Sequence, residues 1–227
     1  MSKIHFLGGE KGGVGKSVLA RVLAQYYIDK ALPFAAVDAD RSHGAMLRFY
    51  AEYTQAGDLD NFETSDHILQ LALDTDRRVL VDLPAQSHRL LTRWMQQGGI
   101  AELAAEQHVP LVYWHVLDDG KDALSLLENV LAGFDKTMQF VAVKNYGRGG
   151  DFSAFDNSDA KKKLEEQGGK SMTLDELHKP TMRKIDHLNV SFWAAGNNDQ
   201  AGLGIIERHR TKVWMRNAYK EFERIEA

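Results

Sequence analysis

Apolar residues along this chain fall into short continuous runs and into longer segments in which they recur every three or four positions. The continuous runs predict buried strands at residues 4–7, 34–37, 78–84, 109–116 and 138–143, with shorter strands at 62–64 and 171–174. The spaced segments predict helices at residues 16–30, 44–55, 66–74, 87–97, 100–107, 122–131 and 160–167, short helices from 174 and from 180, and a long helix at 204–226. Strands that alternate with helices are typical of parallel sheets covered on both faces. We therefore predict an α/β fold, a three-layer sandwich with a mostly parallel central sheet, formed by residues 1–227 as a single domain.

Composition narrows the class of protein. Hydrophobic residues make up 44% and charged residues 26% of the 227 positions, which is ordinary for a globular protein. The chain has no cysteine, which excludes disulfides, thiolate metal sites and iron–sulfur clusters. Neither a signal peptide nor a run of 18 apolar residues is evident, so a cytoplasmic location is expected. The net charge of −4 means that any DNA binding would need a local basic patch.

A glycine-rich stretch, EKGGVGKS at residues 10–17, lies between the first predicted strand and the first predicted helix. Strand, glycine-rich turn and helix form the context of a phosphate-binding loop, whose usual form is G-x-x-x-x-G-K-[ST]. Here Glu10 stands where that form has its first glycine. Backbone N–H groups and the helix N-terminus would hold phosphate oxygens. The residues expected to bind nucleotide in this way are Gly12, Gly13, Val14, Gly15, Lys16, Ser17 and Val18.

Within this loop, Lys16 would reach the β- and γ-phosphates and the Ser17 hydroxyl would bind Mg²⁺. Carboxylates follow two of the predicted strands, at Asp38 and Asp40 after 34–37 and at Asp82 within 78–84. The carboxyl ends of parallel strands face the ligand crevice of an open α/β sheet. Asp82 is therefore expected to hold Mg²⁺ directly or through water.

The loop carries a second lysine, Lys11, and this double-lysine form resembles the deviant Walker A motif of the ParA/MinD family of ATPases. Asp38-Ala39-Asp40 and Asp82-Leu83-Pro84 fit the same resemblance, which covers the first 145 residues in element order. The resemblance implies a P-loop NTPase in which Lys11 crosses a dimer interface and touches the partner's nucleotide. It also implies that Asp40 belongs to switch I, where it would help to position the attacking water and the metal shell.

Further implications of the resemblance concern three other segments. Residues 85–87 would begin switch II, and Asn145 would contact adenine, although an asparagine after a strand is also a common turn residue. Many family members have Pro-Gln after the aspartate pair, whereas this chain has Arg41-Ser42-His43. Arg148, between two glycines in the irregular segment 146–158, could meet phosphate or remain solvated.

The resemblance implies that ATP·Mg²⁺ completes a face-to-face homodimer, that hydrolysis is slow, and that a partner protein accelerates it. Three functions from different classes stay open. The first is a ParA-like ATPase that positions or segregates DNA in plasmid partition, stability or conjugative transfer, together with a DNA-binding adaptor. The second is a MinD-like regulator at a membrane or secretion apparatus. The third is a phosphotransferase that passes the γ-phosphate to a small molecule.

The predicted C-terminal helix bears on the choice between DNA and membrane. An apolar stripe is expected to dock this helix on the core through Ile205, Ile206, Val213, Trp214, Ala218, Phe222 and Ile225. Its other face carries the basic residues Arg208, Arg210, Lys212, Arg216, Lys220 and Arg224. A basic strip could follow phosphate backbones without reading sequence, while an amphipathic helix could lie on an anionic membrane. The nine histidines are scattered without ligand spacing, so none is assigned to a metal.

Overall fold

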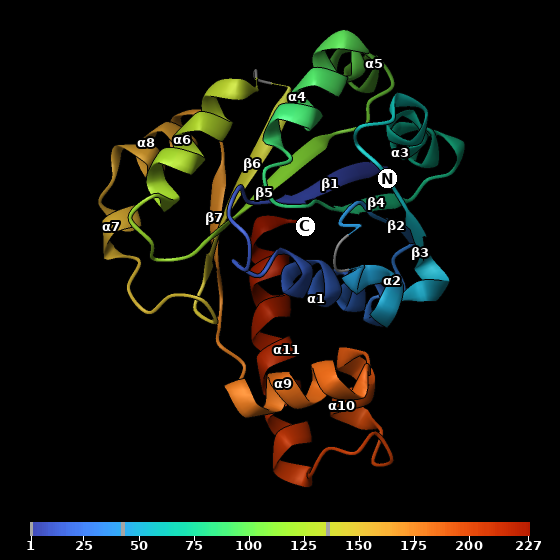
Figure 1. The fold of residues 1–227 in the computed structure, drawn as a ribbon, viewed down its shortest axis with the longest axis vertical. Coiled ribbons are helices and arrows are strands. Elements are labelled where there is room, and N and C mark those ends of the chain that lie inside the picture. The colour runs from blue at the N-terminus through green and yellow to red at the C-terminus, as the bar shows by residue number, and fades with distance from the viewer. Residues whose placement is uncertain (1, 42–43, 135–136) are drawn as a thin grey trace.

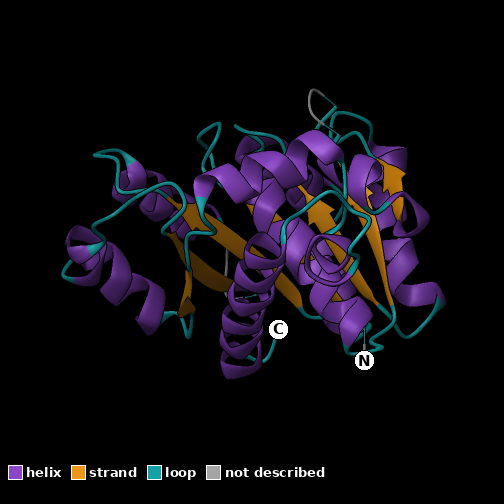
Figure 2. Cartoon of the chain, turned by 90° about the horizontal axis from the view of Figure 1, so that it is seen from below, coloured by secondary structure: helices purple, strands orange, loops and turns teal. Residues whose placement is uncertain are grey.

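The computed structural model describes residues 2–41, 44–134 and 137–227 and is an α/β sandwich of three layers (Figures 1 and 2). Seven strands of the described chain form one sheet in the order β3-β2-β4-β1-β5-β6-β7, and all of their pairings are parallel. The strands are β1 (Lys3–Gly8), β2 (Phe34–Asp38), β3 (Thr54–Ala56), β4 (Arg78–Asp82), β5 (Leu111–Leu117), β6 (Met138–Asn145) and β7 (Lys170–Leu174). The predicted fold class is confirmed.

Helices cover both faces of this sheet. One face carries α3 (Phe62–Asp74), α4 (His88–Gln97), α5 (Ile100–Glu106), α6 (Ala123–Gly133), α7 (Ser153–Asp156) and α8 (Asp159–Glu166). The other face carries α1 (Lys16–Asp29), α2 (Ala45–Phe49), the 3-10 turn η1 (Ala51–Tyr53), α9 (Lys179–Leu188), α10 (Phe192–Asn197) and α11 (Ile205–Ile225). Each face therefore has its own apolar core.

Strand β5 illustrates why the sheet needs helices on both sides. All seven of its residues are buried, and successive side chains point to opposite faces. Tyr113 joins the core under α4 and α6, whereas Trp114 joins the core under α1 and α11. A strand that is apolar on both faces can only lie inside a sheet covered twice.

Two elements predicted between β2 and β4 are wrong. The expected helix 44–55 ends at Phe49 as α2, and the chain then turns through η1 into β3, which pairs with β2 at the edge of the sheet. The expected strand 62–64 is the first turn of α3, because the Asn61 side chain accepts a hydrogen bond of 2.9 Å from the backbone N–H of Glu63 and caps the helix.

The C-terminal third also departs from prediction. Residues 175–178 form a connection, not a helix. Residues 192–204, where the sequence predicts a loop, contain α10, and the Ser191 side chain caps its start. Helix α11 forms as expected, but Ile205 and Ile206 are 75% and 62% exposed, so the docking stripe begins only after them. In Figure 1, α9, α10 and the first half of α11 project beyond the α1–α2 layer. Within the described ranges, no helix has the length and apolarity needed to cross a bilayer.

Candidate nucleotide-binding site

The loop between β1 and α1 has the backbone of a phosphate-binding turn. Gly13 and Gly15 have φ of 78° and 102°, a region that favours glycine. Gly15 also lies so close to Asn145 that a Cβ would come within 2.2 Å of the asparagine Nδ2. A Cβ on Gly12 or Gly13 would meet no atom within 4 Å, because both residues face open space.

That open space is a cavity of about 520 Å³ at the carboxyl edge of the sheet. The residues that line it are Gly12, Gly13, Gly15, Lys16, Ser17, Val18, Arg21, Asp40, Ala45, Arg48, Pro84, Ala85, Arg148 and Asp186. The structure thus brings the predicted loop, switch I and switch II together, with four cationic side chains and two carboxylates. The cations outnumber the carboxylates, so the lining suits a polyphosphate, which carries several negative charges.

Lys16 is 7% exposed, and its Nζ donates a hydrogen bond of 3.1 Å to the backbone carbonyl of Lys11. Burial lowers the pKa of Lys16, while the charges of Asp82 and Asp40 oppose that shift. An ammonium that has lost water gains more from a phosphate than an exposed one would. The position fits the predicted role of Lys16.

Asp82 ends β4 directly beside β1 and is 1% exposed. Burial raises the pKa of Asp82 to about 7, although the Ser17 hydroxyl and the charge of Lys16 oppose the shift; neither carboxylate oxygen accepts a hydrogen bond of ordinary geometry from the described residues. A buried carboxylate that lacks full hydrogen bonding is costly, and a cation would compensate for it. Ser17 lines the adjoining cavity, so the two predicted oxygen ligands fit Mg²⁺.

The described residues contain no group of three or more His, Asp or Glu side chains that could hold a metal by themselves. A Mg²⁺ ion at Ser17 and Asp82 would therefore complete its shell with phosphate oxygens and water, as Mg²⁺ does in nucleotide sites. Asp40, predicted to help with the metal shell, lines the same cavity.

Asp38 has a role that the sequence analysis did not identify. Its side chain is buried and accepts hydrogen bonds from the backbone N–H groups of Met46 at 2.8 Å and Leu47 at 3.1 Å. It thereby fixes the start of α2, the helix that follows switch I. Arg41 pairs with Asp58 at 2.8 Å, while Ser42 and His43 lie outside the described residues.

The Lys11 side chain forms ion pairs with two aspartates of its own chain. Its Nζ lies 2.9 Å from Asp118 Oδ2 and 3.0 Å from Asp122 Oδ1, both in the connection from β5 to α6. Hydrogen bonds to these two carboxylates raise the pKa of Lys11. Neither aspartate belongs to a motif, so the sequence held no signal for this contact. The predicted contact of Lys11 with a partner's nucleotide stays a prediction.

Asn145 is built into the phosphate-binding loop. Its Nδ2 donates a hydrogen bond of 2.6 Å to the backbone carbonyl of Val14, and its Oδ1 accepts one of 3.0 Å from the N–H of Gly147. An amide can make four hydrogen bonds, so these two contacts leave one N–H and one lone pair for a base. The predicted contact with adenine stays a prediction, and the bond to the loop is an additional role.

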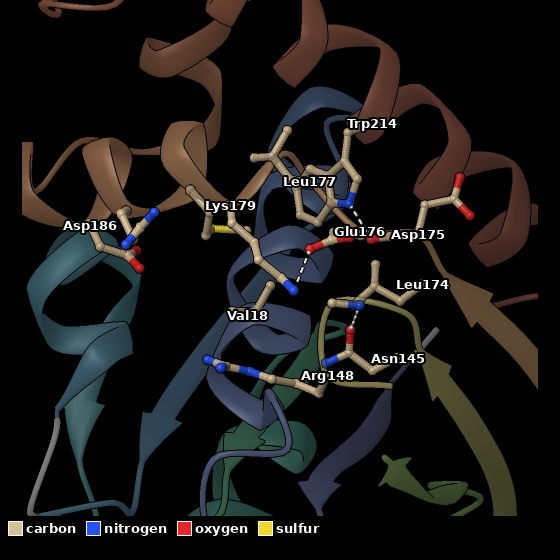
Figure 3. A pocket seen from close by; sticks show the side chains of 13 residues that line it. Val18, Asn145, Arg148, Leu174, Asp175, Glu176, Leu177, Lys179, Asp186 and Trp214 are labelled. Carbon is tan, nitrogen blue, oxygen red and sulfur yellow. Dashed lines mark hydrogen bonds and ion pairs between the residues drawn. The ribbon is translucent and has the colours of Figure 1, made fainter. Parts of the chain in front are cut away.

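A second cavity, of about 300 Å³, lies beside Asn145 (Figure 3). Its walls include the apolar side chains Val18, Leu174, Leu177, Met182 and Trp214. Trp214 is held there by a hydrogen bond of 2.7 Å from its Nε1 to the carbonyl of Asp175. Apolar walls beside a phosphate cavity suit a planar base. These side chains come from α1, the end of β7, the connection after it, α9 and α11. A pattern within one stretch of the sequence could therefore not predict the cavity.

Arg148, from the segment 146–158, was expected either to meet phosphate or to remain solvated. It lines both cavities. The rest of that segment is less irregular than expected. It contains α7, and Phe152 and Phe155 are buried in the core. The backbone N–H of Gly150 donates 2.8 Å to Asp119, which ties the segment to the connection after β5.

Arg21 is a buried residue of the site that the sequence analysis missed. It is 3% exposed on α1, and its Nη1 donates a hydrogen bond of 2.7 Å to Asp186 of α9. The guanidinium lies 3.5 Å from the ring centroid of Phe49 and 4.6 Å from that of Phe192. The Arg21 cation lies between two rings and so links α1 to α2 and α10, while its bond to Asp186 links α1 to α9. Arg21 lies opposite the apolar positions of the predicted helix 16–30, so the spacing of apolar residues held no signal for its burial.

The basic residues of α11 are mostly available to a partner. Arg210, Lys212, Arg216 and Lys220 are exposed, and no ion pair joins them to another described side chain. Arg224 instead bonds Glu221 at 2.8 Å. Lys212, Arg216 and Lys220 recur every four residues, which places them along one side of the helix. By contrast, the lysines of α8 pair within the chain, as at Lys162 and Asp159.

The chain is similar to several known proteins. No protein-family model matches the chain. The chain is 24% identical over 181 residues to Protein MobD of Acidithiobacillus ferrooxidans, a match that covers 77% of this chain and 78% of MobD. It is 30% identical over 147 residues to a Protein TraL of Escherichia coli, covering 63% of this chain and 60% of that protein.

Among solved structures, a nucleotide-binding protein from Archaeoglobus fulgidus in complex with ADP aligns with a TM-score of 0.53 at 15% identity, covering 82% of this chain and 86% of that one. At this level of identity the likeness shows a shared fold. That fold agrees with the resemblance to the ParA/MinD family that the double-lysine loop carries.

Proposed function

We propose that this protein binds ATP with Mg²⁺, hydrolyses it slowly, and uses a nucleotide-dependent homodimer to position or segregate DNA. One observation carries the proposal. The glycine loop, the buried Lys16 and Ser17 line one cationic cavity beside the buried carboxylate of Asp82, and an apolar cavity suited to a base adjoins it.

The residues of the cavity divide the work of phosphoryl transfer. The loop N–H groups and Lys16 bind the β- and γ-phosphates, and Asp40 orients the attacking water. Ser17 and Asp82 hold Mg²⁺, which when bound neutralises charge on the phosphates. Catalysis then consists mainly of positioning and electrostatic stabilisation, so turnover is slow until a partner protein improves the arrangement.

The proposed dimer rests on the ParA/MinD resemblance, which assigns Lys11 to the nucleotide of a second copy. Lys11 exchanges its own Asp118 and Asp122 for the phosphates of the nucleotide in the second copy, which carry more negative charge. Hydrolysis removes part of that charge and loosens the dimer. The result of the cycle is that the bound nucleotide controls which partner the protein binds.

DNA as the surface bound is supported by the α11 row of Lys212, Arg216 and Lys220. The chain as a whole carries a net charge of −4, so a row of exposed cations on one helix is a local feature that suits phosphate backbones. The likeness to the ADP-bound Archaeoglobus protein supports nucleotide as the ligand.

A membrane surface is the second candidate, and one observation favours it. Ile205 and Ile206 are exposed at the start of α11, next to Arg208 and Arg210. Exposed apolar side chains beside cations can enter the interface of an anionic bilayer.

Co-sedimentation separates these candidates. Protein with ATP·Mg²⁺, ADP·Mg²⁺ or no nucleotide is mixed with duplex DNA or with vesicles containing anionic lipid. The proposal predicts DNA binding with ATP only, lost when Lys212, Arg216 and Lys220 are changed together to Ala. The matched control changes Lys161, Lys162 and Lys163 of α8 to Ala and keeps DNA binding. Vesicle binding lost in Ile205→Ser with Ile206→Ser would favour the membrane instead.

Product analysis addresses the chemistry. Incubation with labelled ATP should yield ADP and free phosphate. A phosphorylated small molecule in place of free phosphate would identify a phosphotransferase and overturn the proposed function.

A further inference from the structure

Glu10 stands at the first position of the phosphate-binding loop, where the usual motif has glycine, and it contacts the switch II segment, here residues 85–88. We propose that Glu10 is a positioning residue that ties the loop to this segment, so that movement of the segment on ATP hydrolysis is passed to Lys11. The inference rests on the proposed function and adds a regulatory contact to it.

Two hydrogen bonds form the contact. The Glu10 Oε1 accepts a hydrogen bond of 3.0 Å from the backbone N–H of His88, and the Glu10 carbonyl accepts one of 3.2 Å from the N–H of Gln86. His88 is the first residue of α4, and Ser87 before it makes no side-chain capping bond. Glu10 therefore caps α4 in place of a local residue. A carboxylate at a helix N-terminus is also favoured by the helix dipole.

The segment between these bonds is held in an uncommon conformation. Gln86 has φ of 58°, in the left-handed region that residues with a Cβ seldom adopt. Such a conformation costs about 1 kcal/mol or more and persists where surrounding contacts enforce it. The bond to the Glu10 carbonyl is one such contact. Loss of the Glu10 side-chain bond to His88 would leave fewer contacts to hold this conformation.

The start of the same segment borders the phosphate cavity. Pro84 and Ala85 line the phosphate cavity with Lys16 and Ser17, and Asp82 lies just before them. A change at the γ-phosphate would thus act on a segment that Glu10 also contacts. Order and release of such segments is how nucleotide hydrolysis is usually passed on in this type of site.

The next residue in the chain completes the link. Lys11 follows Glu10 and bonds Asp118 and Asp122 in the connection from β5 to α6. Two neighbouring residues therefore join the loop to two different segments. Movement of α4 and residues 85–88 is transmitted through Glu10 to the backbone of Lys11, the residue proposed to reach the second copy.

Hydrogen exchange tests the contact without requiring turnover. Glu10→Ala removes the side-chain bond to His88 and should speed exchange at the amides of residues 88–91 about fivefold to tenfold, the factor for one lost hydrogen bond of about 1 kcal/mol. The Gln86 amide, which is bonded to the Glu10 backbone carbonyl, should keep its protection. Glu10→Gln keeps an acceptor of the same length and should retain protection, whereas Glu10→Asp is too short and should resemble Ala. The matched control is Glu102→Ala, an acid in the first turn of α5, which should leave these amides unchanged. Unchanged protection in Glu10→Ala would overturn the proposal.

Steady-state kinetics test the coupling. Glu10→Ala should lower kcat about tenfold while KM and ADP affinity stay within twofold of wild type, and Glu10→Gln should restore kcat. Weaker ADP binding with unchanged kcat would mean that Glu10 belongs to the phosphate contacts, which also overturns the proposal. If wild-type protein fails to hydrolyse ATP, the proposed function fails, and the exchange experiment still decides whether Glu10 positions switch II.

Discussion

Lys11 Nζ lies 2.9 Å from Asp118 Oδ2 and 3.0 Å from Asp122 Oδ1 of its own chain. The lysine that the ParA/MinD resemblance assigns to the partner's nucleotide is thus held by two carboxylates in the single chain. These contacts are partly exposed, so their exchange for phosphate contacts in a dimer costs little.

Neutralising the carboxylates should favour the dimer. Asp118→Asn combined with Asp122→Asn should tighten ATP-dependent dimerisation about fivefold, because Lys11 no longer has to leave two negative charges. Lys11→Ala should spare nucleotide binding by the monomer and weaken dimerisation. Analytical ultracentrifugation with a slowly hydrolysed ATP analogue measures both. Asp159→Asn on α8 is the control, and a weaker dimer in the double Asp variant would contradict the account.

Asn145 should support phosphate binding as well as any base contact. Asn145→Ala removes the hydrogen bond to the Val14 carbonyl, so it should weaken binding of ADP and also of tripolyphosphate, which has no base. Loss of a buried bond predicts about a tenfold weaker Kd for both ligands. Calorimetric titration checks this. If tripolyphosphate binds as in wild type while ADP does not, Asn145 acts on the base alone.

His115 should make stability depend on pH. It is 2% exposed at the end of β5, and burial, with the nearby charges of His88 and Lys16, lowers its pKa to about 3. The unfolded chain takes up this proton near pH 6.5, and the folded protein does not, so stability is complete above pH 6.5 and falls as pH drops toward 3. Between pH 7.5 and 5.0 this contribution is about 2 kcal/mol.

Urea unfolding at these two pH values measures the effect. In His115→Gln, the difference in unfolding free energy between pH 7.5 and 5.0 should be smaller than in wild type by about 2 kcal/mol. His187→Gln replaces an exposed histidine and should keep the wild-type difference. An unchanged difference in His115→Gln would contradict the assignment.

The central sheet and the loop were predictable because both depend on local patterns. Continuous apolar runs marked the strands, and the glycines of residues 12–15 marked a backbone that only glycine adopts readily. The failures have a common cause. Residues 54–56 became a strand because β2 had a free edge, and residues 62–64 became helical because Asn61 capped them. The spacing of apolar residues within a short stretch reveals neither the free edge of β2 nor the Asn61 cap.

The site was predictable to the same extent. Lys16, Ser17, Asp40 and Asp82 come from strand ends and the loop; the first three line one cavity, and Asp82 lies near enough for all three to affect its pKa. Distant partners were not predictable. Glu10 caps a helix 78 positions away, and Arg21 pairs with a residue 165 positions away. Such contacts are set by packing and by the need of buried polar groups for partners.

Binding and turnover of ATP by Lys16→Ala test the central claim most directly. The wild-type protein should bind ATP·Mg²⁺ and release free phosphate. Lys16→Ala removes the buried ammonium that faces the phosphates, so ATP affinity or turnover should fall by about a hundredfold or more. Lys30→Ala, at the far end of α1, is the control and should behave as wild type. Hydrolysis of ATP by Lys16→Ala at the wild-type rate would contradict the account.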